Sequence, residues 1–127
     1  MERKKEYNLD ERTFLFAQNV RNLISHIQIH PSFPDDKNQV IRASGSVGAN
    51  YIEANEGLST RDFIMRIKIC RKEAKESHYW LRLMRNCIKE EEKPKADKLI
   101  QESLELAKIF GAIVKKCEGR FLEERKI

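Results

Sequence analysis

The stretch TRDFIMRIKICRKEAKESHYWLRLMRNCIK, residues 60–89, decides the fold of this chain. Its small and apolar residues return in alternating steps of four and three, which is the spacing of the buried face of a helix in a bundle. This face consists of Phe63, Ile67, Cys70, Ala74, Ser77, Leu81, Met84 and Ile88. We therefore predict one long helix over residues 60–89 that packs along its length against other helices.

Three further segments have the same helical periodicity, and we expect helices over about 9–29, 35–56 and 94–117. The first has an apolar seam of Leu9, Thr13, Phe16, Val20, Leu23 and Ile27. Asn8 with Glu11 and Ser59 with Asp62 are spaced as N-terminal helix caps. A chain of 127 residues has the length of one domain. We predict an all-α protein in which residues 1–127 form a single antiparallel up-and-down four-helix bundle, with a charged tail at 118–127.

Glycines give two more local predictions. Gly45 and Gly48 lie inside the uncharged middle of the second segment, where glycine costs about 1 kcal/mol relative to alanine, so close approach of another helix backbone would explain them. Gly57 follows the second segment and suits a left-handed helix end. Leu58 and Phe63 have the spacing of a hydrophobic staple across the next cap. A tight turn should therefore join the second and third helices.

Composition excludes several protein classes. No run of about 18 apolar residues is present, and the first six residues, MERKKE, do not resemble a signal peptide, so we expect a cytoplasmic protein that does not enter a membrane. The three cysteines are far apart and lie on apolar helical faces, which favours buried thiols over disulfides or zinc. We expect no metal and no cofactor. The net charge of +5 allows an acidic partner without requiring one.

Enzyme chemistry has little support in the sequence. None of the three histidines has a glutamate three residues before it, so a di-iron bundle is excluded. Glu73 and Glu76 are one turn apart, as a general acid and base would be, but Lys72 and Lys75 beside them favour ion pairing. We predict a protein that is not an enzyme and has no catalytic residues.

Five basic residues lie seven apart along the third predicted helix and form a basic ladder: Arg61, Lys68, Lys75, Arg82 and Lys89. Seven residues are almost two helical turns, so the ladder climbs one side of the helix over about 42 Å, a length that suits a polyanion. A heptad helix also keeps basic residues on its outer face for solubility alone. Both interpretations are open at this point.

A second apolar group lies away from the buried face of the same helix and consists of Ile69, Tyr79, Trp80 and Leu83. Such a group is large for a surface that a monomer leaves in contact with water, which favours a contact between subunits. Alternatively, the aromatic side chains complete the core of the bundle against a neighbouring helix.

A family resemblance rests on the stretch RASGSVGANYIEA at residues 42–54 and on the pattern KEA, ES and YWL over residues 72–81. With these motifs the chain resembles the four-helix bundle proteins related to those encoded in intervening sequences of bacterial 23S ribosomal RNA. The resemblance implies an antiparallel four-helix bundle that assembles into a ring, typically a homopentamer, without catalytic activity. Similar proteins include accessory proteins of diversity-generating retroelements, which are basic and associate with nucleic acid and a reverse transcriptase.

Two functional hypotheses follow. The first is a non-enzymatic oligomer that binds the phosphates of RNA or DNA, more specifically of RNA, through a basic helix face. The residues predicted to do so are Arg61, Lys68, Arg71, Lys72, Lys75, Arg82, Arg85 and Lys89. The alternative is a protein-interaction or scaffold module that docks a helical partner through Tyr79, Trp80 and Leu83, with no physiological binding of nucleic acid.

Overall fold

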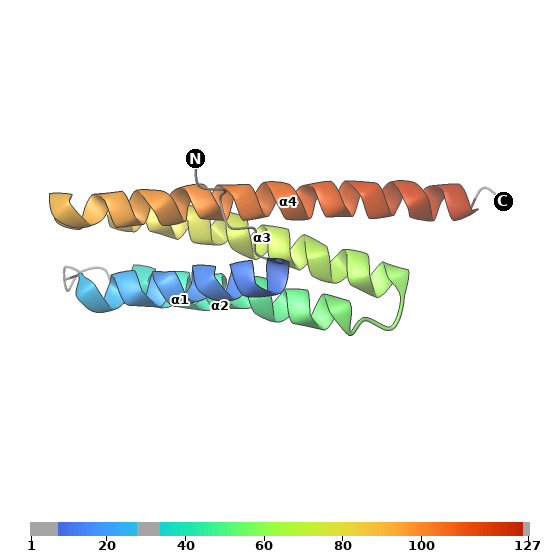
Figure 1. Ribbon diagram of the computed structural model, residues 1–127, viewed down its shortest axis with the longest axis horizontal. Coiled ribbons are helices and arrows are strands. Elements are labelled where there is room, and N and C mark those ends of the chain that lie inside the picture. Colours follow the sequence, from blue (N-terminus) through green and yellow to red (C-terminus); the bar gives the residue numbers. More distant parts are fainter. Residues whose placement is uncertain (1–7, 28–33, 126–127) are drawn as a thin grey trace, which may run out of the picture.

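The computed structural model describes residues 8–27 and 34–125, and these residues form four α-helices in sequence order. They are α1 (Leu9–His26), α2 (Pro34–Asn55), α3 (Thr60–Arg85) and α4 (Lys93–Arg125), and a short 3₁₀ helix, η1 (Glu90–Glu92), precedes α4. Successive helices run in opposite directions along the long axis (Figure 1). The prediction of an all-α, up-and-down four-helix bundle is confirmed.

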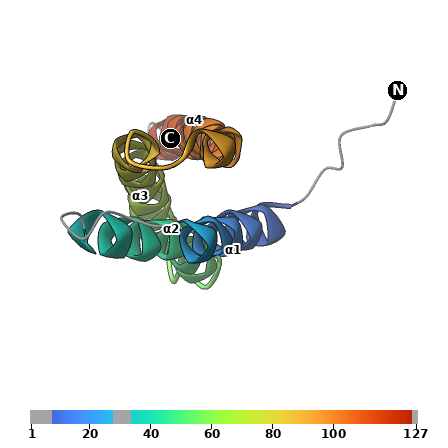
Figure 2. The same ribbon diagram turned by 90° about the vertical axis from the view of Figure 1, so that its left-hand side faces the viewer.

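The helices pack in an uneven ring around one core. Helix α3 has the most extensive contacts, with α4 on one side and α2 on the other, whereas α1 packs mainly on α2 and meets α4 sparsely. Viewed along the long axis, α1 and α2 lie on the opposite side of the molecule from α4, and α3 runs between the two sides (Figure 2). The contact between α1 and α4 is therefore the most open side of the bundle.

The predicted buried faces form the core. Phe16 and Val20 of α1, Ile67 and Leu81 of α3, and Phe110 of α4 are all at most 1% exposed. Phe16, Val20, Ile67 and Leu81 belong to the predicted seams, whose steps of three and four bring side chains to one side of a helix. Phe63 and Ile88, the two ends of the predicted α3 seam, are only partly buried, although both pack against the core.

Both predicted N-terminal caps are present. The side chain of Asn8 accepts a hydrogen bond from the backbone N–H of Glu11 at 2.9 Å, and that of Ser59 accepts one from Asp62 at 3.1 Å. Each bond satisfies one of the backbone donors that a helix start leaves free. The caps explain why α1 and α3 begin within a residue of their predicted starts.

Glycine in α2 permits close packing against α1, as predicted. A Cβ atom on Gly48 would lie 3.0 Å from the Oγ1 atom of Thr13, and one on Gly45 would lie 3.2 Å from a guanidinium nitrogen of Arg21. Thr13 cannot easily give way, because its hydroxyl donates a 2.7 Å hydrogen bond to the carbonyl of Leu9. The small residues of α2 therefore set how closely α1 approaches.

The turn between α2 and α3 differs from prediction. No glycine in the described residues has a positive φ, so Gly57 does not form a left-handed helix end. Glycine is needed there for space, since a Cβ atom would lie 2.9 Å from the carbonyl of Ala54 and 2.9 Å from the carboxylate of Asp62. Leu58 is 98% exposed, so the predicted staple with Phe63 does not form.

Three helix ends also differ. α1 stops at His26 rather than near residue 29, because Ile27 is extended and packs its side chain against the core. α3 stops at Arg85 rather than at Lys89, and Asn86 is its C-terminal cap. α4 continues to Arg125, so residues 118–125 are helical and not a tail, whereas residues 126–127 lie outside the described part.

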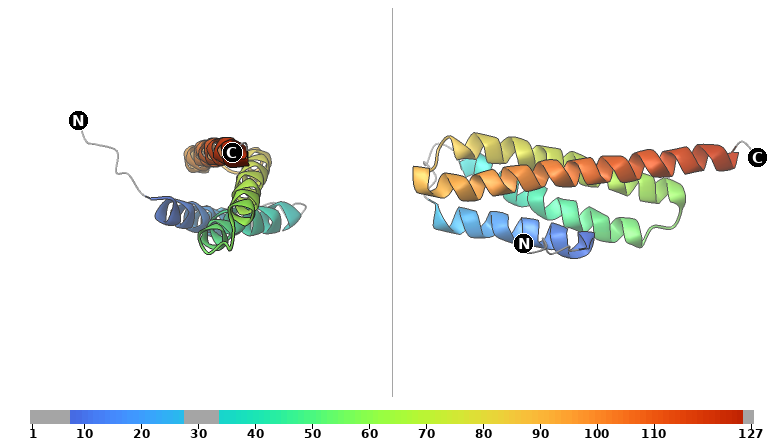
Figure 3. Two further views of the ribbon diagram at one scale, coloured as in Figure 1. Left: turned by 90° about the vertical axis from the view of Figure 1, so that its right-hand side faces the viewer. Right: turned by 45° about the horizontal axis from the view of Figure 1, so that its top comes forward.

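The extension of α4 has a simple cause. Residues 118–125 contain good helix formers, and the one unfavourable residue, Gly119, costs only about 1 kcal/mol. The C-terminal end of α4 reaches beyond the other three helices (Figures 1 and 3). Within the described residues, no helix is long and apolar enough to cross a membrane.

Candidate nucleic-acid interface

Helix α3 positions most of the predicted nucleic-acid-binding residues on one outer surface. The exposed residues are Arg61, Lys68, Lys72, Lys75, Arg82 and Lys89, and the half-buried ones are Arg71 and Arg85. Seven-residue spacing keeps Arg61, Lys68, Lys75 and Arg82 on the side of α3 opposite its buried face. At about 1.5 Å per residue these four span roughly 32 Å.

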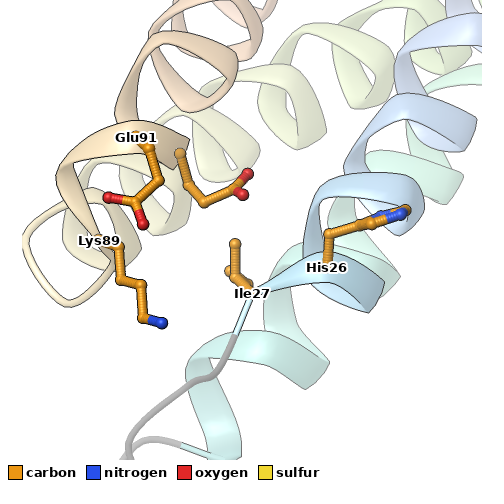
Figure 4. Close-up of a pocket in the computed structure, with 5 residues that line it drawn as sticks. His26, Ile27, Lys89 and Glu91 are labelled. Atoms are coloured by element: carbon orange, nitrogen blue, oxygen red, sulfur yellow. The ribbon is translucent and has the colours of Figure 1, made fainter.

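Lys89 does not belong to this surface, which corrects the predicted ladder. It follows the end of α3 in an extended backbone conformation before η1. Its side chain lines a pocket of about 210 Å³ at one end of the bundle, together with His26, Ile27, Glu91 and Glu92 (Figure 4). Because α3 ends at Arg85, the ladder has four members on α3 instead of five.

A shallow depression lies at the centre of the basic surface. It measures about 370 Å³ and is lined by Lys68, Arg71, Lys72, Lys75 and Glu76. Arg71 reaches the boundary with α4, where Gly111 has no side chain to displace it; a Cβ atom on Gly111 would lie 3.6 Å from the Cδ atom of Arg71. Four cations therefore surround a hollow with one carboxylate.

The one carboxylate of the depression is already paired. Arg42 of α2 lies 3.1 Å from an oxygen of Glu76 and 3.4 Å from an oxygen of Glu73. Glu73 and Glu76 thus form ion pairs, as predicted, but their partner is Arg42 from another helix rather than Lys72 or Lys75. The two lysines consequently keep their charge for another ligand.

Two of the predicted cations are paired with carboxylates of α4. The Nζ atom of Lys68 lies 2.7 Å from Glu118, and the guanidinium of Arg85 binds Asp97 through two nitrogens. Arg85 therefore serves the packing of α3 on α4. No ion pair within 4.0 Å is present between the remaining cations of α3 and any carboxylate in the described residues.

We define the α3 patch as the basic residues that stay on the outer surface of α3: Arg61, Lys68, Arg71, Lys72, Lys75 and Arg82. Two titratable groups report its electrostatics. Burial lowers the pKa of His78, and the neighbouring positive charge of Arg82 lowers that pKa further. Burial raises the pKa of Glu73, the charge of Glu76 adds to this, and Arg42 opposes it.

The four residues predicted to form an oligomer interface divide into two groups. Tyr79 and Leu83 are exposed by 55% and 38%, as a contact surface would require. Trp80 packs partly against the core and stacks edge-on against Tyr79 with ring centres 5.2 Å apart, so the alternative of core completion holds for Trp80. Ile69 is half-buried. The exposed surface is therefore smaller than predicted.

Sequence reasoning missed one member of this surface. Met65 is 48% exposed on α3, and its distance from Tyr79 and Leu83 is 14 and 18 residues, close to whole numbers of helical turns. That periodicity was visible in the sequence. We define the α3 apolar strip as Met65, Tyr79 and Leu83.

The described residues contain no group of three or more His, Cys, Asp or Glu side chains that is arranged to hold a metal ion. The cysteines are free thiols, and burial raises the pKa of Cys70 to about 12, which matches the predicted buried thiol. Cys87 and Cys117 are only half-buried.

Comparisons with known proteins give two findings. Residues 5–112 match the family described as 23S rRNA-intervening sequence protein. A crystal structure of a protein of unknown function from the S23 ribosomal protein family of Bacteroides thetaiotaomicron VPI-5482 is similar at 28% sequence identity and a TM-score of 0.71, over 85% of this chain and 99% of that chain. No curated protein matches the chain.

Proposed function

Because this chain belongs to the 23S rRNA-intervening sequence protein family, we propose that it is a non-enzymatic protein that binds the phosphate backbone of structured RNA through the α3 patch. The observation that carries this proposal is the depression on α3, where Arg71, Lys72 and Lys75, together with Lys68, surround a single carboxylate that is ion-paired with Arg42. Of these four cations, Lys68 alone has a carboxylate partner among the described residues, Glu118. A surface kept basic in this way attracts a polyanion.

The form of the patch favours a long ligand over a small one. Its cations extend along about six turns of α3. The depression is shallow and lined almost entirely by charged side chains, whereas small-molecule sites are concave and mostly apolar. Evenly spread lysines and arginines contact phosphates without reading base edges. The protein should therefore recognise the shape and charge of a folded RNA more than its sequence.

We further propose that the protein works as a homo-oligomer, with five subunits as the expected number, and that the α3 apolar strip contributes to the contact between subunits. Exposed Tyr79 and Leu83 carry apolar area that a neighbouring subunit would bury. Repeating the patch in each subunit would strengthen binding to one RNA by increasing the effective concentration of sites. Light scattering gives the mass directly, and a stable monomer would contradict this part.

The experiment that tests the binding surface compares two double charge reversals. Lys72→Glu with Lys75→Glu changes the α3 patch, and Lys37→Glu with Lys108→Glu makes the same change of net charge at exposed positions of α2 and α4. Fluorescence anisotropy with a labelled RNA duplex should show a loss of about tenfold or more in affinity for the first variant only. An equal loss in both variants would show that net charge, not the patch, governs binding.

Exposed Tyr79 and Leu83 also support the alternative function, a module that docks a helical protein partner on the α3 apolar strip. The variant Tyr79→Ala with Leu83→Ala separates the two functions, because it removes apolar area without placing a carboxylate beside Lys75 and Arg82. Under the RNA proposal it alters the mass of the assembly and weakens RNA binding only through the loss of multivalency. If the isolated subunit of this variant binds no RNA at all while the α3 patch is intact, the assignment of the patch is wrong.

A further inference from the structure

The open side of the bundle contains a groove that the α3 patch does not include. It lies between α1 and α4, measures about 450 Å³ and is lined by Asn19, Asn22, Leu23, His26, Lys95, Lys98 and Leu99. The groove lies between two helices that have few close contacts with each other. Its volume falls in the range of sites that hold small organic groups.

The lining of the groove is chemically mixed. Leu23 and Leu99 form an apolar floor, since they are 4% and 7% exposed and belong to the core. Asn19 and Asn22 stand exposed on the α1 side, and Lys95 and Lys98 stand exposed on the α4 side. Hydrogen bonds from Ser25 and His26 go to the backbone carbonyl of Asn22, so these bonds leave its side-chain amide available.

The charge of the groove is positive. No carboxylate lines it, although Glu92 outside the lining lies 3.4 Å from the Nζ atom of Lys95. Lys98 has no carboxylate within 4.0 Å among the described residues. The hydrogen bond from Nδ1 of His26 to the carbonyl of Asn22, at 2.7 Å, leaves the other ring nitrogen free to face a ligand. An anionic ligand with a flat apolar part fits this combination best.

We infer that the groove between α1 and α4 binds an unpaired nucleotide, with its base over Leu23 and Leu99 beside the amides of Asn19 and Asn22, and its phosphate on Lys98 and Lys95. An unpaired base presents two apolar faces and a polar edge, whereas a base inside a duplex exposes neither face. This inference rests on the proposed function and deepens it, because it specifies RNA with loops or bulges as the preferred ligand.

One residue connects the groove to the rest of the basic surface. His26 lines both the groove and the pocket at the end of the bundle, and Lys89 lines that same pocket. Figure 4 shows the ring nitrogens of His26 on the side away from Lys89 and Glu91. An RNA strand that follows the α3 patch to its Arg82 end would therefore pass Lys89 and reach the groove around the end of the bundle.

The test uses two RNA probes, a perfect duplex and a hairpin of equal length with an unpaired loop, and two matched pairs of variants. Asn22→Asp places a charge in the groove without a change of size, and Gln18→Glu does the same outside it on α1. Lys98→Glu and Lys108→Glu form the corresponding pair on α4. All four positions are exposed, and circular dichroism checks that each variant folds.

We expect the unmodified protein to prefer the hairpin by about tenfold, the factor that one good base contact supplies. Asn22→Asp and Lys98→Glu should lose this preference and keep their affinity for the duplex, whereas the two control variants should keep both. An unmodified protein without a preference for the hairpin would overturn the inference. A preference that survives in both groove variants would overturn it as well.

A second measurement separates this inference from the proposed function. Adenosine 5′-monophosphate is added to isotopically labelled protein, and the NMR signals that move identify where it binds. Shifts at Asn19, Asn22 and Lys98 support the groove even if no duplex binds to the α3 patch. Shifts confined to Lys72 and Lys75 would contradict the inference while leaving the proposed function intact.

Discussion

The Nζ atom of Lys68 on α3 lies 2.7 Å from the Oε1 atom of Glu118 on α4. Both side chains are close to half exposed, so the pair adds little to stability, but it offsets the charge of Lys68 in the middle of the α3 patch. Glu118→Gln removes that offset. We expect it to raise the affinity for an RNA duplex by roughly twofold to fivefold at low salt.

Fluorescence anisotropy checks this prediction, with Glu123→Gln as the control. Glu123 is an exposed residue of α4 five positions further along the helix, and its change gives the same net charge. An equal increase in affinity for the RNA duplex in both variants would show that the charge of the whole protein, not the release of Lys68, produced the effect.

The two glycines that face neighbouring helices should respond to alanine in opposite ways. Gly48→Ala places a Cβ atom 3.0 Å from Oγ1 of Thr13 and should lower the free energy of unfolding by about 1–3 kcal/mol. Gly111→Ala places one at an ordinary 3.6 Å from Arg71 and should raise it by about 0.5–1 kcal/mol. Urea unfolding measures both. Equal effects of the same sign would contradict the packing described here.

Glu73 should make the stability of the protein fall as the pH rises. Its pKa is raised in the folded state, chiefly by burial, so the folded protein binds the proton more tightly than the unfolded chain. The free energy of unfolding therefore decreases from the ordinary glutamate pKa of 4.5 up to the raised value. Glu73→Gln removes this dependence. Urea unfolding should therefore show that the free energy of unfolding of the variant increases relative to that of the unmodified protein as the pH increases. The opposite trend would contradict the assigned burial.

His78 should report RNA binding at the α3 patch. Burial and then Arg82 lower its pKa from the ordinary value of 6.5. A phosphate bound at Arg82 would offset that positive charge and so raise the pKa of His78. An NMR titration of the imidazole signals with and without an RNA duplex measures the change. An unchanged pKa in the presence of tightly bound RNA would place the RNA elsewhere.

Local signals in the sequence predicted most of the fold. The caps at Asn8 and Ser59 and the seam through Ile67 and Leu81 depend on neighbours along one helix, and these predictions were confirmed. The α2–α3 turn was harder to predict from the sequence. Glycine is required at position 57 because of the surrounding atoms of Ala54 and Asp62, and not because of its own backbone angles. The predicted end of α4 was wrong because residues 118–127 were interpreted as a charged tail, whereas charged residues such as glutamate and arginine are good helix formers and α4 continues to Arg125.

The candidate site was predictable only in part. Spacing alone placed Arg61, Lys68, Lys75 and Arg82 on one surface of α3. The pairing of Lys68 with Glu118 and of Arg42 with Glu76 depends on which helices are neighbours, and no pattern within one helix contains that information. The groove between α1 and α4 was not predicted at all, since it arises where two distant segments fail to pack closely.

The dependence of RNA binding on salt tests the central claim most directly. Removing one cation that binds a phosphate should reduce the slope of the logarithm of affinity against the logarithm of salt concentration by about 0.9. The variant Lys72→Ala with Lys75→Ala is therefore predicted to show a slope smaller by about 2 than that of the unmodified protein, while Lys37→Ala with Lys108→Ala shows the original slope. A slope that is the same in all three proteins would contradict phosphate binding by the α3 patch.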